Sequence, residues 1–224
     1  MSVQEGIIKF HLEHQTADLE PRRYGELSCR LAAWRQVMSL TRLVGQNPDL
    51  YEGAGYGNVS ARIGPPSAAL GRRSFLITAT QTSGKSEIDL GDFVVVERYD
   101  SRRNWVKSHG RQHPSSESMT HGAIYDLGPH IRCVLHAHSP ALWRQARALR
   151  LPTTAPGVSY GSPGMAQEVQ RLFRERAAAE RQILAMGGHE DGILAFGRSP
   201  EETGQVLIRE LARAFEIQYA AAGR

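Results

Sequence analysis

The stretch from Val134 to Pro140 starts as an apolar run that ends in two histidines one residue apart, His136 and His138. Ser139 and Pro140 follow at once and favour the start of a helix. Because residues i and i+2 of a strand point to the same face, the two imidazoles project together at the strand's end. Neutral imidazoles held on a rigid strand suit a divalent transition metal, zinc above all. The run therefore predicts a strand, then a helix, with two metal ligands where they join.

The rest of the chain is patterned like a globular protein. It has 224 residues, of which 41% are hydrophobic and 22% are charged, so it is long enough to bury a sizeable core. No internal repeat or composition shift marks a boundary, and we expect one domain over residues 1–224. Residues 1–20 are poorly patterned, and we expect that part to be loosely ordered, with His11 and His14 at its surface.

Charge and cysteine content narrow the partners and the compartment. The net charge of +4 is spread along the chain, which permits binding of small anions and does not predict binding of nucleic acid. No apolar run approaches the ~20 residues that span a bilayer, and no secretory signal is visible, so we expect no membrane partner. Cys29 and Cys133 both lie in apolar segments, and we expect buried free thiols in a cytoplasmic protein.

Hydrophobic periodicity outlines the secondary structure. Short alternating or apolar runs predict strands, and runs of 3.6-residue period between proline and glycine signals predict helices. The strands are expected at 58–63, 75–78, 93–97, 104–107, 134–138, 183–186 and 193–196, and the helices at 21–44, 115–125, 140–148, 165–181 and 199–221. This order fits an α/β or α+β fold of three layers, in which helices flank a largely antiparallel sheet.

A third metal ligand has several candidates, namely His109, His113, His121, His130 and His189. His189 stands out because it lies in a glycine-rich turn between two predicted strands, where a side chain can reach a neighbouring strand end. Glu190 and Asp191 follow it and could ligate the metal or orient an imidazole. The simpler interpretation is that these histidines are hydrogen-bonded residues of turns and strand ends.

An acid and several hydrogen-bond donors could complete a site. Glu117 follows two serines at a predicted helix start, with Ser115 or Ser116 as the N-cap residue. Such an acid is ordinarily a helix-capping carboxylate, although beside a metal it could transfer protons. The backbone N–H groups at this helix start, and the turns at Gly57-Asn58 and Thr82-Ser83-Gly84, could bind an anion or could be ordinary turns.

Taken in order, these motifs resemble the class II aldolase/adducin family. The residues that carry the resemblance run from about 25 to 215 and are Gly57-Asn58-Val59-Ser60, Ser83-Gly84 after Ile77-Thr78, Pro114-Ser115-Ser116-Glu117 and His136-Ala137-His138-Ser139. The family includes sugar-phosphate aldolases, an epimerase and a dehydratase, and also the non-catalytic head domain of adducin. The resemblance implies a three-layer α/β/α fold with a central, largely antiparallel sheet, and a homotetramer.

The resemblance also implies roles for individual residues. His136, His138 and His189 would hold a divalent ion, zinc foremost, and Glu117 would be the catalytic acid/base. A phosphate or carboxylate of the substrate would be bound by Gly57, Asn58, Ser83, Gly84, Ser115 and Ser116. The implied activity is that of a metal-dependent lyase of aldolase type, acting on a small phosphorylated or carboxylated hydroxy-carbonyl compound through an enediolate. The alternatives are a dehydratase, epimerase or decarboxylase of the same fold, or a non-enzymatic adducin-like interaction module.

The chain departs from the family's pattern in three places. Glu190-Asp191 separates His189 from the glycine of the last strand, which leaves Asp191 as an alternative third ligand. The loop after Thr78 is longer than usual, so Thr80 and Gln81 compete with Ser83 and Gly84 for the anion. The segment between His138 and His189 is shorter than in the fuculose-phosphate enzyme, and the region that supplies that enzyme's carbanion-stabilising tyrosine is missing. Tyr160 lies nearby in sequence but aligns with a different part of the pattern.

Overall fold

An eight-stranded sheet forms the centre of the protein, which a computed structural model describes for residues 6–175 and 177–223. The strand order is β1-β7-β6-β5-β4-β8-β10-β9, and every neighbouring pair is antiparallel except β1 and β7. The strands are β1 (His11–Thr16), β4 (Asn58–Arg62), β5 (Phe75–Thr78), β6 (Phe93–Asp100), β7 (Trp105–Gly110), β8 (Cys133–His138), β9 (Ile183–Ala185) and β10 (Gly192–Gly197). The predicted, largely antiparallel sheet is confirmed.

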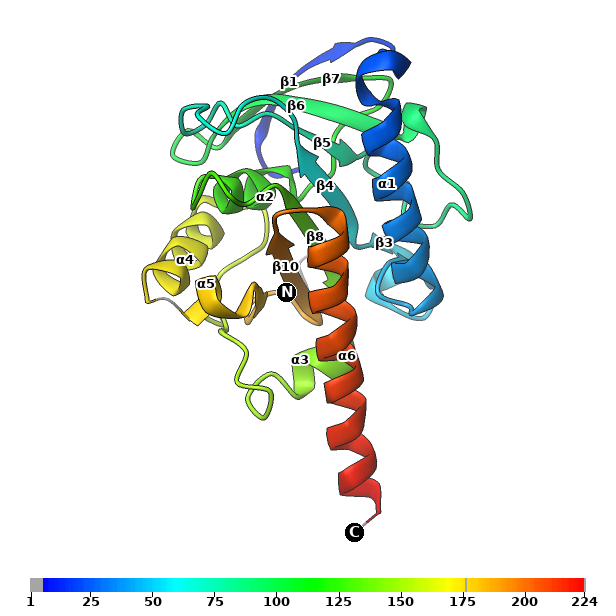
Figure 1. Cartoon of the computed structure of the whole chain (residues 1–224), viewed down its shortest axis with the longest axis vertical. Coiled ribbons are helices and arrows are strands. Elements are labelled where there is room, and N and C mark those ends of the chain that lie inside the picture. Colours follow the sequence, from blue (N-terminus) through cyan, green and yellow to red (C-terminus); the bar gives the residue numbers. More distant parts are fainter. Residues whose placement is uncertain (1–5, 176, 224) are drawn as a thin grey trace.

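Helices cover both faces of the sheet, which gives the three predicted layers (Figure 1). One face packs against α1 (Pro21–Leu40), α3 (Pro140–Arg144) and α6 (Pro200–Ala222), through Leu31, Leu142 and Leu207. The other face packs against α2 (Ser118–Tyr125) and α4 (Pro163–Arg174), with α5 (Ala177–Arg181) beside them. The fold is therefore an α/β/α sandwich.

The sequence explains why the middle of the sheet is buried on both sides. The residues of β4, β5, β8 and β10 are all buried, and most of their side chains are apolar, as expected of strands covered on both faces. Along β8, Val134 and the two histidines point toward α2 and α4, whereas Leu135 and Ala137 join the core under α1 and α6. The strand pattern thus aims both imidazoles at the same helical layer.

The N-terminal region differs from the expectation of loose order. Residues 11–16 form β1, which pairs in parallel with β7 at the edge of the sheet, while residues 1–5 lie outside the described part of the chain. The ring of His14 makes two contacts with β7: Nδ1 lies 2.9 Å from Ser108 Oγ, and Nε2 lies 3.1 Å from the Gly110 carbonyl oxygen. The strand is polar and its partner is distant in sequence, so local periodicity does not reveal it.

Several predicted boundaries are corrected. The helix expected from Ser115 begins at Ser118, with Glu117 in the N-cap position, so the predicted N-cap at Ser115 or Ser116 is wrong. The helix expected over 165–181 is found as α4 and α5, and residue 176 lies outside the described chain. The helix expected over 140–148 ends at Arg144.

Four short elements lie between the longer helices and strands. The strands β2 (Gly45–Gln46) and β3 (Gly55–Tyr56) form a two-stranded ribbon around a helical turn, η1 (Tyr51–Gly53), and a second such turn, η2 (Leu90–Asp92), precedes β6.

Both cysteines are free, as predicted, but only Cys133 is buried. Cys29 is exposed because it lies on the outward side of α1.

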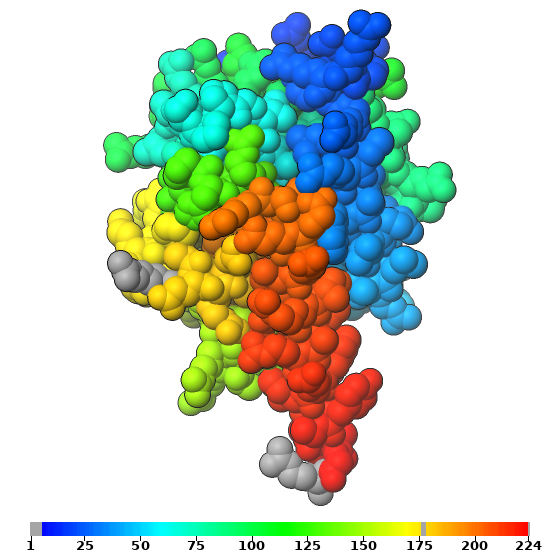
Figure 2. Space-filling model, viewed as in Figure 1, coloured from blue at the N-terminus to red at the C-terminus, as the bar shows by residue number. Residues whose placement is uncertain are grey.

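The C-terminal helix extends beyond the body of the protein. Its first turns pack beside α1, and its last turns project past the other helices (Figures 1 and 2). Phe215 and Tyr219 on these last turns are exposed. Among the described residues, the helices are all too short or too polar to cross a membrane.

Candidate metal centre and anion pocket

Three histidines meet at the end of the central strands. His136 and His138 come from β8, and His189 comes from the turn between β9 and β10. Strand β10 pairs with β8 so that Gly192 lies opposite His138. One ring nitrogen of each histidine lies within 4.8 Å of the other two. All three side chains are buried, with exposed fractions of 0, 1 and 5%. The sheet therefore gathers the three predicted ligands in one place.

The donor set fits a divalent transition metal. Nδ1 of His136 donates to the Ile193 carbonyl at 3.2 Å, which fixes the tautomer and leaves Nε2 as the ring's lone-pair donor. Three buried imidazoles that converge in this way suit a Zn²⁺ ion, which binds nitrogen at about 2.0–2.1 Å and keeps a further position for substrate in catalytic sites. Neutral imidazoles bind such an ion through their nitrogen lone pairs, so the three ligands need no anionic side chain among them.

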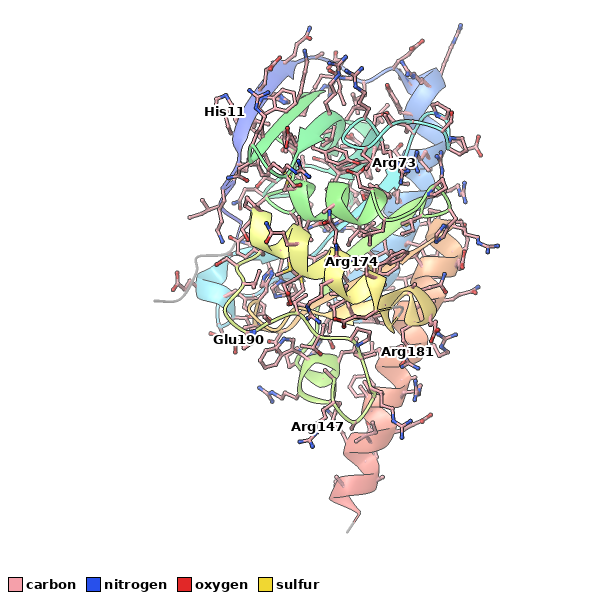
Figure 3. All side chains as sticks on the ribbon, turned by 90° about the vertical axis from the view of Figure 1, so that its left-hand side faces the viewer. His11, Arg73, Arg147, Arg174, Arg181 and Glu190 are labelled. Atoms are coloured by element: carbon pink, nitrogen blue, oxygen red, sulfur yellow. The ribbon has the colours of Figure 1, made fainter. Side chains whose placement is uncertain are left out.

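Asp191, the alternative third ligand, is used elsewhere. Its Oδ2 accepts a hydrogen bond of 2.7 Å from the Tyr51 hydroxyl. The other acid of the spacer, Glu190, is exposed on the surface (Figure 3). The geometry thus groups His189, and not Asp191, with the β8 histidines.

The side chain of Glu117 extends toward the histidines and does not bond to the start of its helix. It occupies the N-cap position of α2, but its side chain makes no capping hydrogen bond. Its Oε1 lies 3.4 Å from Nδ1 of His189, and only 1% of the residue is exposed. Burial alone would raise the pKa of Glu117, but contact with His189 and the electrostatic influence of nearby His136 outweigh it and lower that pKa to about 2. The buried carboxyl is therefore ionised at neutral pH in the metal-free protein.

A small polar pocket lies next to the triad. Five of the six residues predicted to bind an anion line it, together with both competitors from the longer loop, Thr80 and Gln81. The five are Gly57, Asn58, Ser83, Ser115 and Ser116. The sixth, Gly84, is not among the lining residues and belongs to a neighbouring pocket, where it packs against Gln46.

Backbone pairing and one buried arginine shape this pocket. Asn58 pairs with His136 across β4 and β8, so the pocket and the triad share two adjacent strands. Ser83 donates its hydroxyl to the Gly57 carbonyl at 3.0 Å. Arg35 of α1 donates to the carbonyls of Thr82, Ser83 and Lys85, so it holds the loop in place. Sequence patterning places arginines on the polar sides of α1 and gives no sign of this burial.

Two residues near the site, Lys9 and Gly6, could not be predicted from the sequence. Nζ of Lys9, in the segment before β1, lies 3.4 Å from the ring centroid of Tyr160. The Tyr160 ring in turn lies 4.6 Å from the ring of His189. Gly6, in the same segment, is among the residues that line the polar pocket. A cation in an otherwise unpatterned segment carries no local signal that would assign it to a site.

The remaining candidate histidines lie elsewhere. His121 is fully buried on α2, and its Nδ1 lies 2.7 Å from the Ser60 hydroxyl, which also contacts the Tyr125 hydroxyl at 2.7 Å. Burial lowers the pKa of His121 to about 4, so the ring is neutral. His109 pairs with Glu97 at 2.8 Å on the other half of the sheet. His113 stacks edge-on against His14. His130 is exposed in the turn before β8, so all four follow the simpler, structural interpretation.

Comparisons with known proteins agree with this fold. The chain matches, over residues 35–219, the family described as Class II Aldolase and Adducin N-terminal domain. A comparison with curated protein sequences returned no match.

Solved structures with the same fold cover nearly the whole chain. An L-fuculose-1-phosphate aldolase from Thermus thermophilus is 18% identical, with a TM-score of 0.64 over 88% of this chain and 95% of its own. A sugar-phosphate aldolase from Thermotoga maritima is 16% identical, with a TM-score of 0.63 over 90% and 98%. An aldolase II superfamily protein from Pseudomonas syringae is 22% identical, with a TM-score of 0.60 over 91% and 77%. The chain belongs to the class II aldolase and adducin N-terminal domain family.

Proposed function

We propose that the protein is a metal-dependent lyase of aldolase type that acts on a small phosphorylated or carboxylated hydroxy-carbonyl compound. The observation that carries this proposal is the meeting of three buried histidines, a buried carboxylate and a pocket of hydroxyl and amide donors. Each group has an ordinary structural explanation on its own. Their convergence at one end of one sheet supports a catalytic role for the whole set.

We assign His136, His138 and His189 as ligands of one divalent ion, most plainly Zn²⁺. Bound there, the ion would act as a Lewis acid toward a carbonyl and hydroxyl of the substrate, and would so stabilise an enediolate. Glu117 has a lowered pKa in the metal-free site, and its ionised carboxylate beside the triad is suited to accept a proton from the substrate and to return it later. Its burial excludes water from that transfer.

The polar pocket is assigned to the anionic end of the substrate. Its described lining consists of neutral residues, whose N–H and O–H groups can donate to phosphate or carboxylate oxygens. We include Gly57, Asn58, Ser83, Ser115 and Ser116, and add Thr80 and Gln81. Gly84 shapes the loop from its other side. Lys9 supplies a positive charge near the triad, through its contact with Tyr160, and this charge favours an anionic substrate.

Other chemistry of the same fold remains the main alternative. A dehydratase, an epimerase or a decarboxylase would need the same metal and the same buried carboxylate. An adducin-like interaction module would need neither, and the placement of Glu117 beside His189 therefore favours an enzyme over that alternative.

The deciding experiment is a substrate screen with the zinc-loaded protein. Sugar phosphates and hydroxy acids are tested separately for cleavage, dehydration, epimerisation and decarboxylation. The proposal expects turnover in the cleavage assay for at least one anionic compound, with loss of turnover in His138→Ala. Turnover in another assay alone would replace the lyase by that activity, and no turnover in any assay would favour the interaction module.

We further propose that the chain acts as a single domain in the cytoplasm, as a homotetramer, without nucleic acid or membrane partners. The continuous sheet with one core on each face supports the single domain. Light scattering on the purified protein tests the tetramer, and a monomeric mass at working concentration would contradict it.

A further inference from the structure

Tyr51 lies against one of the three histidines. It belongs to the turn between β2 and β3, and its ring meets the ring of His138 edge-on, with centroids 4.6 Å apart and planes at 74°. Tyr56 on β3 contacts the same imidazole, with centroids 5.5 Å apart. Two tyrosines from one short ribbon thus contact the ring of His138, whereas His136 is oriented by the Ile193 carbonyl.

Asp191 connects Tyr51 to the backbone that follows His138. The Tyr51 hydroxyl donates to Asp191 Oδ2 at 2.7 Å, and the backbone carbonyl of Asp191 accepts from the N–H of Ser139 at 2.8 Å. Ser139 directly follows His138 in the chain. Tyr51 therefore contacts the imidazole of His138, and the partner of Tyr51, Asp191, is also bonded to the backbone next to His138.

The backbone at both ends of this hydrogen bond is unusual. Tyr51, Glu52 and Asp191 have φ values of 49°, 58° and 60°, in the left-handed region that non-glycine residues seldom adopt. Such conformations persist where the surrounding structure over-determines them, and they gather at functional sites. Both partners of this hydrogen bond thus have left-handed backbone, which supports a role for the contact beyond an ordinary loop.

Asp191 is also the residue that interrupts the family's pattern before the last strand. Its neighbour Glu190 is exposed, whereas Asp191 is 6% exposed and bonded to Tyr51. A loop anchor far from the triad would explain the hydrogen bond but not the ring contact with His138. Asp191 and Tyr51 are therefore best explained together, as a pair that acts on the imidazole of His138.

We propose that Tyr51 and Asp191 are a positioning pair that fixes the imidazole of His138 for metal binding. The inference deepens the proposed function and rests on it, since it concerns the same site. The hydrogen bond holds the phenol ring, and the ring limits rotation of the imidazole. Neither residue is placed on the reacting atoms, so both act through His138.

The test is the zinc affinity of the metal-free protein, measured against a chelating competitor. Tyr51→Ala removes the ring and is expected to raise the Kd for zinc by about 10–100-fold, the range typical for lost partners of a metal ligand. Tyr51→Phe and Asp191→Ala each remove the same hydrogen bond, so each should raise the Kd by a smaller factor. The double variant Tyr51→Phe/Asp191→Ala should raise the Kd by less than the product of the two single effects, because both variants lose one shared interaction. Glu190→Ala, which alters the exposed neighbour, is the matched control and should keep the wild-type Kd.

Cobalt substitution separates positioning from a general loss of stability. The visible absorption of bound Co²⁺ reports the ligand geometry, and it should change in Tyr51→Ala well below its unfolding temperature. Wild-type zinc affinity and an unchanged cobalt spectrum in folded Tyr51→Ala would overturn the proposal. If Tyr51→Ala does not fold, unchanged affinity in Tyr51→Phe and Asp191→Ala would overturn it equally. Failure of the wild-type protein to bind zinc or cobalt would contradict the proposed function as well, and so is a distinguishable result.

Discussion

Glu117 is the residue whose surroundings differ most from those of an ordinary helix-start acid. Its carboxylate makes no cap hydrogen bond, is almost completely buried and faces His189. Glu117 directly precedes α2, and its side chain extends toward His189 without bonding to the first turn of the helix. An ionised group in so dry a place needs positive partners, and a dication held by the three histidines would provide one.

The first prediction concerns this carboxylate. Glu117→Gln keeps the shape of the side chain and removes its ability to accept a proton. We expect the variant to retain zinc and to lose turnover by about 10²–10⁴-fold, the usual contribution of a positioned acid/base. The screen that identifies a substrate supplies the assay, and metal content is measured on the same sample.

The control for Glu117 is Glu190→Gln, which makes the same change in an exposed acid close to His189 in sequence. Its turnover should equal that of the wild-type protein. Undiminished turnover in Glu117→Gln would remove Glu117 from the mechanism and would leave its burial as a structural feature.

At the scale of elements, local sequence patterns predict the helices and strands that pack into the core. They do not predict the elements and side chains whose partners are distant in sequence. The apolar strands β5, β6 and β8 and the capped helix α6 follow from side-chain periodicity and from Ser199-Pro200. The polar strand β1 has no such pattern, because β7 and not the core determines its conformation. Arg35, Lys9 and Tyr51 were missed for the same reason: their contacts are distant in sequence and involve carbonyls or rings that no motif marks.

The second prediction concerns the turn that leads into β4. Gly57 has a φ of +77°, and a Cβ there would lie 2.6 Å from Val44 Cγ2 and 3.1 Å from the His136 carbonyl. Gly57→Ala should therefore lower the free energy of unfolding, by about 1–3 kcal/mol from backbone strain alone. Urea unfolding of the purified variant measures this change.

A glycine in α1 provides the matched control. Gly25 is helical, and a Cβ there would meet nothing within 4 Å. Gly25→Ala should raise the free energy of unfolding by roughly 0.5–1 kcal/mol, since alanine is the better helix former. If both substitutions change stability equally, the account of a tightly enclosed turn next to His136 is wrong.

For the whole molecule, the order of the strands decides where the chemistry lies. β8 lies between β4 and β10, so Asn58, the two β8 histidines and the turn with His189 meet, although β4 and β10 are far apart in sequence. Nothing in the local sequence specifies this order. The position of His189 in a glycine-rich turn favoured it among several candidates, and the resemblance to a known family implied that it joins the β8 pair, although neither gave the strand order.

The third prediction is that the metal-free protein loses stability in mild acid. Burial holds the pKa of His121 at about 4 in the folded protein, against an ordinary value of 6.5. Because the unfolded chain takes up this proton first, the stabilisation is complete above pH 6.5 and is lost as the pH falls toward 4. The loss from this one group amounts to as much as about 3 kcal/mol. The lowered pKa of Glu117 adds a further loss between about pH 4.5 and 2.

Urea unfolding at a series of pH values measures this loss. His121→Gln, which has no titrating ring, should show a flatter profile between pH 6.5 and 4 than the wild-type protein. An unfolding free energy that stays constant from pH 7 to 4 would contradict the assignment of His121 as a buried, neutral histidine.

The most direct test of the central claim is the metal content of the purified protein. We expect about one divalent ion per chain, zinc foremost, and its loss in His136→Ala and in His138→Ala. His113→Ala, which alters a histidine that stacks against His14 outside the triad, should keep the ion. A correctly folded wild-type protein that neither contains nor takes up a divalent ion would contradict the claim.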